Sequence, residues 1–291
     1  MSGRRIKNLI LLILALAVCF LLLAVVPGKM SAQREESALH KGLTELLASY
    51  GVSIDPALLT PGETLYAIEL ENPDASNAAQ ALLGSKAVSQ ETAARGLASY
   101  TSELGSMQLS RYEILYSAAS GTVSLSRSGA LHAELSAAVG GRSYEQDMQR
   151  RLRGMGYTVW QTQPAVRQAD GVYALGVEQA LLGMPVFGGT LTFSYQNGML
   201  CAADGVFYPE SGSIARVSEE ACISCADALT QILASRDALG WVGSQITGMQ
   251  QGYLPSETAT SALRFTPVWR VETDTTVFYV NGITREVRQA E

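Results

Sequence analysis

The chain has 291 residues, of which 47% are apolar and 16% are charged. This length allows one large domain or two smaller ones. Charged content below the ~25% of an average soluble domain, together with many glycines, excludes a coiled coil and a disordered acidic chain. Three of the 21 basic residues lie within the first 28 positions, so 18 basic and 27 acidic residues follow, a balance of −9. We therefore expect no nucleic-acid partner.

An apolar run from Leu9 to Val26 is the strongest feature of the sequence. As a helix it would span ~27 Å, close to the hydrocarbon thickness of a bilayer. The rival interpretation is a cleaved signal peptide, which has a shorter apolar region and a small-x-small cleavage site. Neither Val25 to Pro27 nor Met30 to Ala32 supplies such a site well. The sequence thus predicts a retained, single-pass membrane anchor.

Cations near the anchor predict its orientation. Arg4, Arg5 and Lys7 precede it without an acid among them, whereas Lys29 and Arg34 follow it and are soon joined by acids. Because cations favour the cytoplasmic side, the large C-terminal part is expected outside the cytoplasm. The expected segments are a cytoplasmic tail (1–8), a transmembrane helix (9–26) and a juxtamembrane segment (27–37).

Residues 38–139 are expected to form a first α+β unit. A helix is predicted over residues 38–50, where Leu39, Leu43, Leu46 and Leu47 share one face and Gly51 follows as a stop. The remaining predicted elements are a strand at 65–70, a helix at 75–83 ended by Gly84, and strands at 111–117 and 122–126.

Residues 140–291 are expected to form a second α+β unit with an antiparallel sheet. Ser143 is the predicted N-cap of a helix that runs to about Met155. Asn197 and Gly198 tolerate positive φ, so they predict a hairpin between strands at 191–196 and 199–207. A further helix is predicted from Ser218 to about Ser235, with strands at 157–162, 172–179, 266–272, 275–280 and 283–288.

Residues 218–291 end the chain with a predicted helix and strands in a particular order. Ser218 to Ala221 open the predicted helix, a Trp269-Arg270-Val271 strand follows, and a hairpin runs from Phe278 to Val287. This part of the chain resembles the PepSY domain. In that family the last turn usually has glycine before Glu-Val, and here Arg285 occupies that place. The resemblance implies an antiparallel sheet covered by one helix.

The whole layout combines the basic tail, the anchor, the Asn197-Gly198 hairpin and the PepSY-like end with four short segments, Tyr50 to Ile54, Leu82 to Gly84, Val177 to Gln179 and Gly183 to Phe187. This layout is similar to that of the YycI/YycH group, membrane-anchored accessory regulators of an essential sensor histidine kinase in low-GC Gram-positive bacteria. The similarity implies a regulator of cell-wall homeostasis without chemistry of its own. Its implied partners are the kinase and a paralogous regulator, contacted in part through the membrane helix.

Two small residues in the anchor are candidate partner contacts. Ala15 and Cys19 form one small-xxx-small step, a spacing that permits close approach of two membrane helices. Incidental small residues on a lipid-facing helix are the simpler interpretation, and both remain open.

No catalytic residue, cofactor or metal site is expected. The two histidines, His40 and His132, are interpreted as ordinary surface residues. The sequence lacks the serine-hydrolase elbow, the zinc-protease motif, the phosphate loop and the dinucleotide fingerprint. A glycosidase-like pair of carboxylates is not excluded, because its members can lie far apart along the chain.

The Cys222-x-x-Cys225 pair is interpreted as buried core. Both cysteines are predicted to lie a turn inside the helix that starts at Ser218, on the face of Ala226, Leu229 and Leu233. A zinc site would need two further ligands, and Cys201 is the nearby candidate. Three cysteines beyond the anchor do not suit a disulfide framework.

Two other functions stay open beside the kinase regulator. One is an anchored PepSY-type peptidase inhibitor or binding module. The other is an unrecognised extracytoplasmic enzyme, which would show a pocket of convergent ionisable groups. A kinase gene or a peptidase gene next to this one would separate the first two.

Overall fold

The computed structural model describes residues 38–71, 76–91, 97–110, 114–118, 121–125, 129–168, 171–210, 213–257 and 263–290. The predicted tail, anchor and juxtamembrane segment, with Ala15 and Cys19, lie outside the described residues. Among the helices within these ranges, none is both long and apolar enough to span a bilayer.

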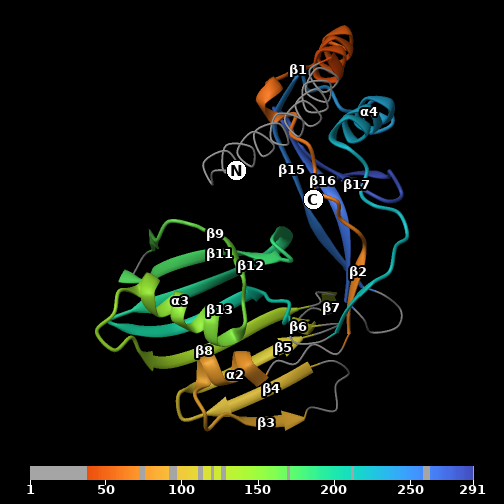
Figure 1. Ribbon diagram of the computed structural model, residues 1–291. Coiled ribbons are helices and arrows are strands. Elements are labelled where there is room, and N and C mark those ends of the chain that lie inside the picture. The colour runs from red at the N-terminus through yellow and green to blue at the C-terminus, as the bar shows by residue number, and fades with distance from the viewer. Residues whose placement is uncertain are drawn as a thin grey trace, which may run out of the picture.

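A central sheet is formed by the middle of the chain (Figure 1). Its order is β3-β4-β5-β8-β13-β12-β11 with antiparallel neighbours, and β9 and β10 pair with the other edge of β11. The strands are β3 (Val88–Glu91), β4 (Leu97–Ser102), β5 (Gly105–Ser110), β8 (Ala130–Ala138), β9 (Val159–Thr162), β10 (Val166–Arg167), β11 (Tyr173–Leu181), β12 (Met184–Gln196) and β13 (Met199–Val206). A separate hairpin, β6 (Ile114–Ala118) and β7 (Gly121–Leu125), lies between β5 and β8 in the sequence.

Two helices, α2 (Ser76–Leu83) and α3 (Tyr144–Met155), pack side by side on the central sheet (Figure 1). The Ser143 hydroxyl accepts a hydrogen bond from the Gln146 amide, and the Gln146 side chain accepts one from the Ser143 amide. This capping box confirms the predicted start of α3. The predicted Asn-Gly hairpin is also confirmed, with φ of 52° at Asn197 and 75° at Gly198.

A buried ion group fixes α3 to its surroundings. The Asp147 carboxylate, fully buried, accepts hydrogen bonds from Arg150 Nη2 (2.7 Å), Arg151 Nε (2.6 Å) and the Tyr195 hydroxyl (3.2 Å). Arg151 Nη1 donates to the Ala81 carbonyl at 3.2 Å, at the end of α2. One carboxylate therefore connects α3 to the sheet directly and to α2 through Arg151.

A terminal sheet combines strands from both ends of the described chain. Its order is β14-β2-β16-β15, with β17 and β18 continuing beside β16 and the short β1 parallel to β15. The strands are β1 (Ser53–Ile54), β2 (Ile68–Glu71), β14 (Ser213–Arg216), β15 (Gln245–Glu257), β16 (Leu263–Thr273), β17 (Val277–Asn281) and β18 (Val287–Gln289). The helix over residues 38–49, the 3₁₀ helix η1 (Pro56–Leu58) and α4 (Cys225–Ser235) share a core with this sheet.

The predicted boundary between residues 139 and 140 is not where the structure divides. β8, from the expected first unit, pairs with β13 from the second, and β2 pairs with both β14 and β16. Residues 76–210 thus form an insertion within a unit made of residues 38–71 and 213–290. Strand partners depend on packing between distant segments, which local periodicity does not reveal. The α+β class and the antiparallel character of the sheets are as predicted.

The two sheets meet where β12 touches β15. Val186 pairs with Tyr253 in a parallel bridge, and a shared apolar cluster surrounds it, including Leu70, Leu181 and Phe265. A Cβ on Gly252 would lie 2.6 Å from the Pro185 carbonyl oxygen, so a glycine is required at this close approach. The joint is therefore packed with apolar side chains from both sheets.

Candidate functional site

Helix α4 begins at Cys225 and not at Ser218. The Ser224 hydroxyl accepts a hydrogen bond from the Asp227 amide (3.1 Å), and Asp227 Oδ2 accepts one from the Ser224 amide (3.4 Å). A capping box needs a side chain three residues after the capping serine that accepts a hydrogen bond from the serine amide. Ala221 follows Ser218 at this spacing and cannot accept one, whereas Asp227 follows Ser224 and can. Ser218 instead accepts from the Ala67 amide at 2.9 Å. The reciprocal cap was a signal in the sequence that the prediction missed.

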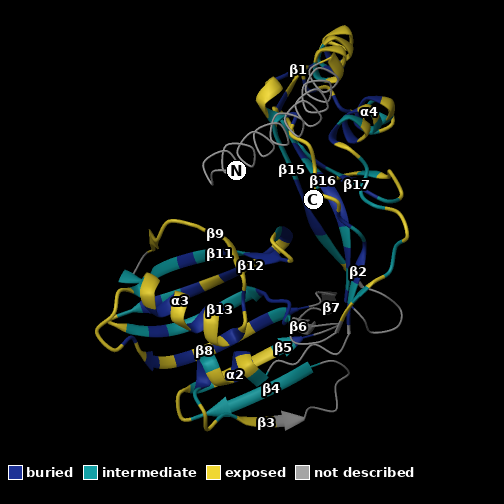
Figure 2. Ribbon diagram, in the orientation of Figure 1, coloured by how far each residue is buried: buried dark blue, intermediate teal, exposed yellow. Residues whose placement is uncertain are grey.

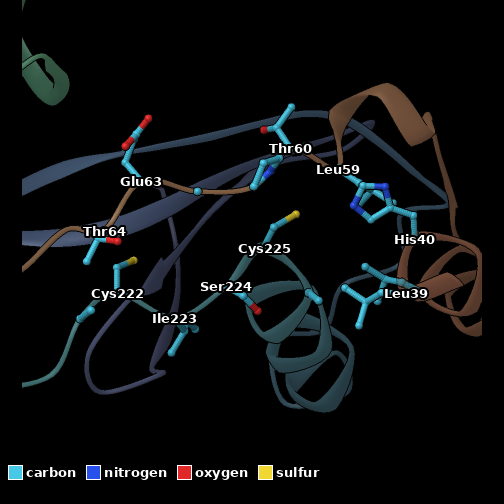
Figure 3. A pocket seen from close by; sticks show the side chains of 15 residues that line it. Leu39, His40, Leu59, Thr60, Glu63, Thr64, Cys222, Ile223, Ser224 and Cys225 are labelled. Carbon is cyan, nitrogen blue, oxygen red and sulfur yellow. The ribbon is translucent and has the colours of Figure 1, made fainter. Parts of the chain in front are cut away.

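A mostly apolar groove of about 570 Å³ lies where the α4 N-terminus, the helix 38–49 and the segment 59–64 come together. Figure 3 shows Leu39 and His40 at one end and Thr64 and Cys222 at the other. The lining residues are Leu39, His40, Leu43, Leu59 to Thr64 and Ala221 to Ala226. This α4 groove, named for the helix whose N-terminus lines it, is the candidate functional site.

Two buried side chains hold the walls of the groove. Gln251, on β15, accepts a hydrogen bond from the Glu63 amide (2.7 Å) and donates to the Glu63 carbonyl (3.1 Å). Trp269, on β16, donates from Nε1 to the Ile223 carbonyl at 2.8 Å. A Cβ on Gly62 would lie 2.6 Å from the Trp269 ring, so the chain passes directly over the indole. Both walls are thus fixed to the β15–β16 hairpin.

The two cysteines of the groove are free thiols. Cys225 is buried and its Sγ lies 3.4 Å from Met249 Sδ, while Cys222 packs against Gly282. Burial raises the pKa of Cys225 to about 11. Burial also raises the pKa of Cys222, against a smaller lowering by the Gln251 side chain. The predicted shared helix face is wrong for Cys222, which precedes α4, although Cys225 does contribute to the core.

The structure separates the other residues considered in the sequence. Cys201 lies on β13 of the central sheet, apart from the cysteine pair. His40 lines the groove, whereas His132 lies on β8, pairs with Asp204 through Nδ1 and has Nε2 3.7 Å from Glu134 Oε1. Within the described ranges, no three His, Cys, Asp or Glu side chains are placed to hold a metal ion.

The groove suits binding better than reaction. Its apolar walls carry a few hydrogen-bonding groups, a combination typical of sites that accept an apolar side chain or small molecule. Both of its thiols are held in the protonated form, which is the unreactive form of cysteine. The sequence had singled out the cysteines, but Leu39 and Leu59 come from segments far away in the chain.

Comparison with known proteins gives distant structural likenesses. No family model matches the chain, and no curated protein matches it. An uncharacterized protein from Eubacterium rectale ATCC 33656 is 10% identical, with a TM-score of 0.42, over 82% of this chain and 85% of that one. The Bacillus megaterium YpeB C-terminal domain is 10% identical, with a TM-score of 0.36, over 75% of this chain and 96% of that domain. At these values the likenesses assign neither a family nor a function.

Proposed function

We propose that this protein is a membrane-anchored regulator that binds and modulates the sensor histidine kinase of a two-component system. The observation that carries the proposal is the position of the helix 38–49. It begins 12 residues after the apolar run of Leu9 to Val26, and it presents apolar side chains both to the core and to the outside. The resemblance of the sequence to the YycI/YycH group supplies the kinase as partner.

The end of the chain supports the resemblance to the PepSY domain. Helix α4 packs with β15 to β18 in an antiparallel arrangement, as that resemblance implies for residues 218–291. Arg285, where the family usually has glycine, has a φ of 64°. This is the left-handed region that glycine adopts without strain. The turn therefore has the left-handed backbone conformation that glycine favours, although arginine occupies the position.

Regulation of this kind requires no reaction by the protein itself. A bound protein shifts a kinase between signalling states when it contacts one state more favourably than the other. The anchor supplies contacts within the membrane, and the part of the chain beyond it supplies contacts outside the cytoplasm. A helix with few polar groups offers packing but little selectivity, so both parts are expected to contribute.

Two variants test the proposal. In one, Leu9 to Val26 is replaced by an unrelated membrane helix of equal length, and in the other, everything after Ser37 is deleted. Each variant is expected to recover less kinase from detergent extracts than the full-length protein and to change transcription of the kinase's target genes. If neither variant changes kinase output and the full-length protein recovers no kinase, the proposal is wrong. Recovery of a peptidase instead would favour the inhibitor.

A further inference from the structure

An exposed apolar strip of three side chains runs along the helix 38–49 and onto Tyr50, the residue that follows it. In Figure 2 much of this helix has the colour of exposed residues. Leu39, Leu46 and Tyr50 are 56%, 40% and 53% exposed. Their spacing of seven and four residues places them on one side of the helix, next to the face on which Leu43 and Leu47 are buried. We call these three residues the outer strip. Leu39 also lines the α4 groove, so the strip continues the groove's apolar wall.

The outer strip is fixed in place by Arg236. Its guanidinium donates to the Tyr50 carbonyl (2.5 Å) and to the Gly243 carbonyl (3.1 Å). These bonds hold the loop after α4 against the end of the helix 38–49, and that loop carries Val242, which is 84% exposed. A partner bound to the strip would therefore contact an element that is packed into the terminal-sheet core.

The size of the strip indicates what kind of partner fits it. Three or four side chains cover much less than the ~800 Å² per partner that a stable complex in solution buries. A partner anchored in the same membrane meets the strip at a high effective concentration, so a small contact suffices. The apolar run ends 13 residues before Leu39, a stretch that spans at most ~45 Å even when fully extended. The strip thus stays within reach of the membrane-proximal part of an anchored partner.

Charge argues against two other occupants. The chain beyond residue 28 has a net charge of −9, so two copies brought side by side repel each other, and an anionic lipid surface repels it as well. On the helix itself, Lys41 and Glu45 form an exposed pair at 3.9 Å that adds no net charge. These charges leave a partner that is neither a second copy nor an anionic lipid surface.

We infer that the outer strip, together with Val242, is the docking surface for a partner helix that continues from a membrane span and carries apolar residues on one face. A groove and a neighbouring apolar strip accept such a helix through side chains spaced three, four and seven residues apart. The inference rests on the proposed function, since it assigns the surface by which the outer part of the protein contacts the kinase.

Crosslinking from single positions tests the surface. A photo-reactive amino acid is placed at Leu46, or as a control at Ala48, an exposed position on the opposite side of the same helix, in the full-length protein in its native membrane. Position 46 is expected to crosslink to a kinase segment that borders a membrane span, and position 48 is not. A product of two copies of this chain, or products with lipid alone, would overturn the inference.

A matched pair of variants tests the contribution of the strip to binding. Leu46→Ser with Tyr50→Ser removes two exposed apolar side chains that do not line the groove, and Lys41→Ser with Ala48→Ser changes the other side of the helix. The first pair is expected to lower recovery of the kinase about tenfold, the effect of removing side chains at the centre of a small contact. Both pairs should keep the thermal midpoint within about 3 °C, since the side chains are exposed.

The outcomes separate this inference from the proposed function. If wild-type protein recovers the kinase and the Leu46→Ser, Tyr50→Ser protein recovers it equally well, the strip is not the docking surface and the proposed function stands. If wild-type protein recovers no kinase, the proposed function fails and the inference fails with it.

Discussion

At the scale of single residues, the buried carboxylate of Asp147 has the largest expected effect on stability. Replacement by alanine leaves Arg151 buried without its partner and leaves the Tyr195 hydroxyl unpaired. Breaking a buried ion pair in this way costs about 3–5 kcal/mol of unfolding free energy. Urea denaturation of Asp147→Ala measures the loss. Arg150→Ala, which removes the more exposed partner, is the control and should cost less than about 1 kcal/mol.

The same carboxylate predicts a dependence on pH. Burial acts to raise the pKa of Asp147, but hydrogen bonds and charges from Arg150 and Arg151 outweigh it and lower the pKa overall. The folded state therefore favours the ionised form, and this contribution is complete above the ordinary carboxyl pKa. It is lost as the pH falls through the lowered value. In acid titrations followed by urea denaturation, Asp147→Asn should lose less stability than wild type below about pH 4.

Cys222 and Cys225 are expected to behave as core residues. Replacement of both by alanine should lower the unfolding free energy by about 1–3 kcal/mol through lost packing. Because burial raises the pKa of Cys225 to about 11, its alkylation at pH 8 should be about 100-fold slower in the folded protein than in urea. The contribution of the protonated Cys225 thiol to the unfolding free energy should be complete below the ordinary thiol pKa and should be lost as the pH rises through 11. Stoichiometric zinc in purified protein would contradict this prediction.

Arg285 offers a stabilising substitution. Its backbone has a φ of 64°, which costs a residue with a side chain about 1–2 kcal/mol, and its side chain is exposed. Arg285→Gly removes this strain but increases the freedom of the unfolded chain. We expect a net gain of about 0.5 kcal/mol in unfolding free energy, measured by denaturant titration. Arg288→Gly, in β18 without positive φ, should destabilise the protein instead.

At the scale of elements, Ser218 and Ser224 have different roles near the start of α4. Ser224→Ala removes the capping hydroxyl and should cost about 1 kcal/mol of unfolding free energy, together with some helix content near Cys225. Ser218→Ala removes the acceptor for the Ala67 amide outside the helix, so it should leave the helical signal unchanged. Circular dichroism combined with denaturant titration distinguishes the two effects. Equal loss of helix in both variants would contradict the observed cap.

Elements with local signals were predicted well from the sequence. The stop at Gly51, the cap at Ser143 and the Asn197-Gly198 turn each depend on residues a few positions apart. The long strand β15 was missed, because Gly248, Gly252 and Pro255 interrupt its alternation. A glycine is required at position 252 because a Cβ there would collide with the carbonyl oxygen of Pro185, a residue far away in the sequence.

The candidate site could be predicted only in part, for the same reason. The Cys222-Cys225 motif identified one wall, and the apolar face of the helix 38–49 identified another. That face is divided in the structure, since Leu43 and Leu47 are buried while Leu39 and Leu46 are exposed. Which side chains remain outside depends on the position of α4 and the terminal sheet, and no pattern within the helix contains that information.

At the scale of the whole molecule, the inserted unit and the surrounding unit should differ in their ability to fold alone. The core between α2, α3 and the central sheet is made entirely from residues 78–207. A fragment of residues 76–210 should therefore fold by itself, with helix and sheet signals and a cooperative urea transition. Its stability should be reduced by exposure of Leu181, Val186 and Tyr208, which pack against the terminal sheet in the whole protein.

The complementary fragment provides the contrast. Residues 213–290 lack Leu43, Leu47 and Leu59 of the terminal-sheet core and the strand β2 that lies between β14 and β16. This fragment should not show a cooperative transition unless residues 38–71 are supplied. If residues 213–290 fold alone while residues 76–210 do not, the assignment of the two units is wrong.

The pairing of β2 with β16 also determines the order in which the protein can assemble during synthesis. Ile68 leaves the ribosome almost 200 residues before its partner Phe265. The inserted unit is complete by residue 210 and can fold first, while the segment closest to the N-terminus stays open until the last strands have emerged. Contacts over such sequence separations form slowly. Exposed apolar residues of the helix 38–49 are thus available to chaperones or to a partner before the terminal sheet closes over Leu43 and Leu47.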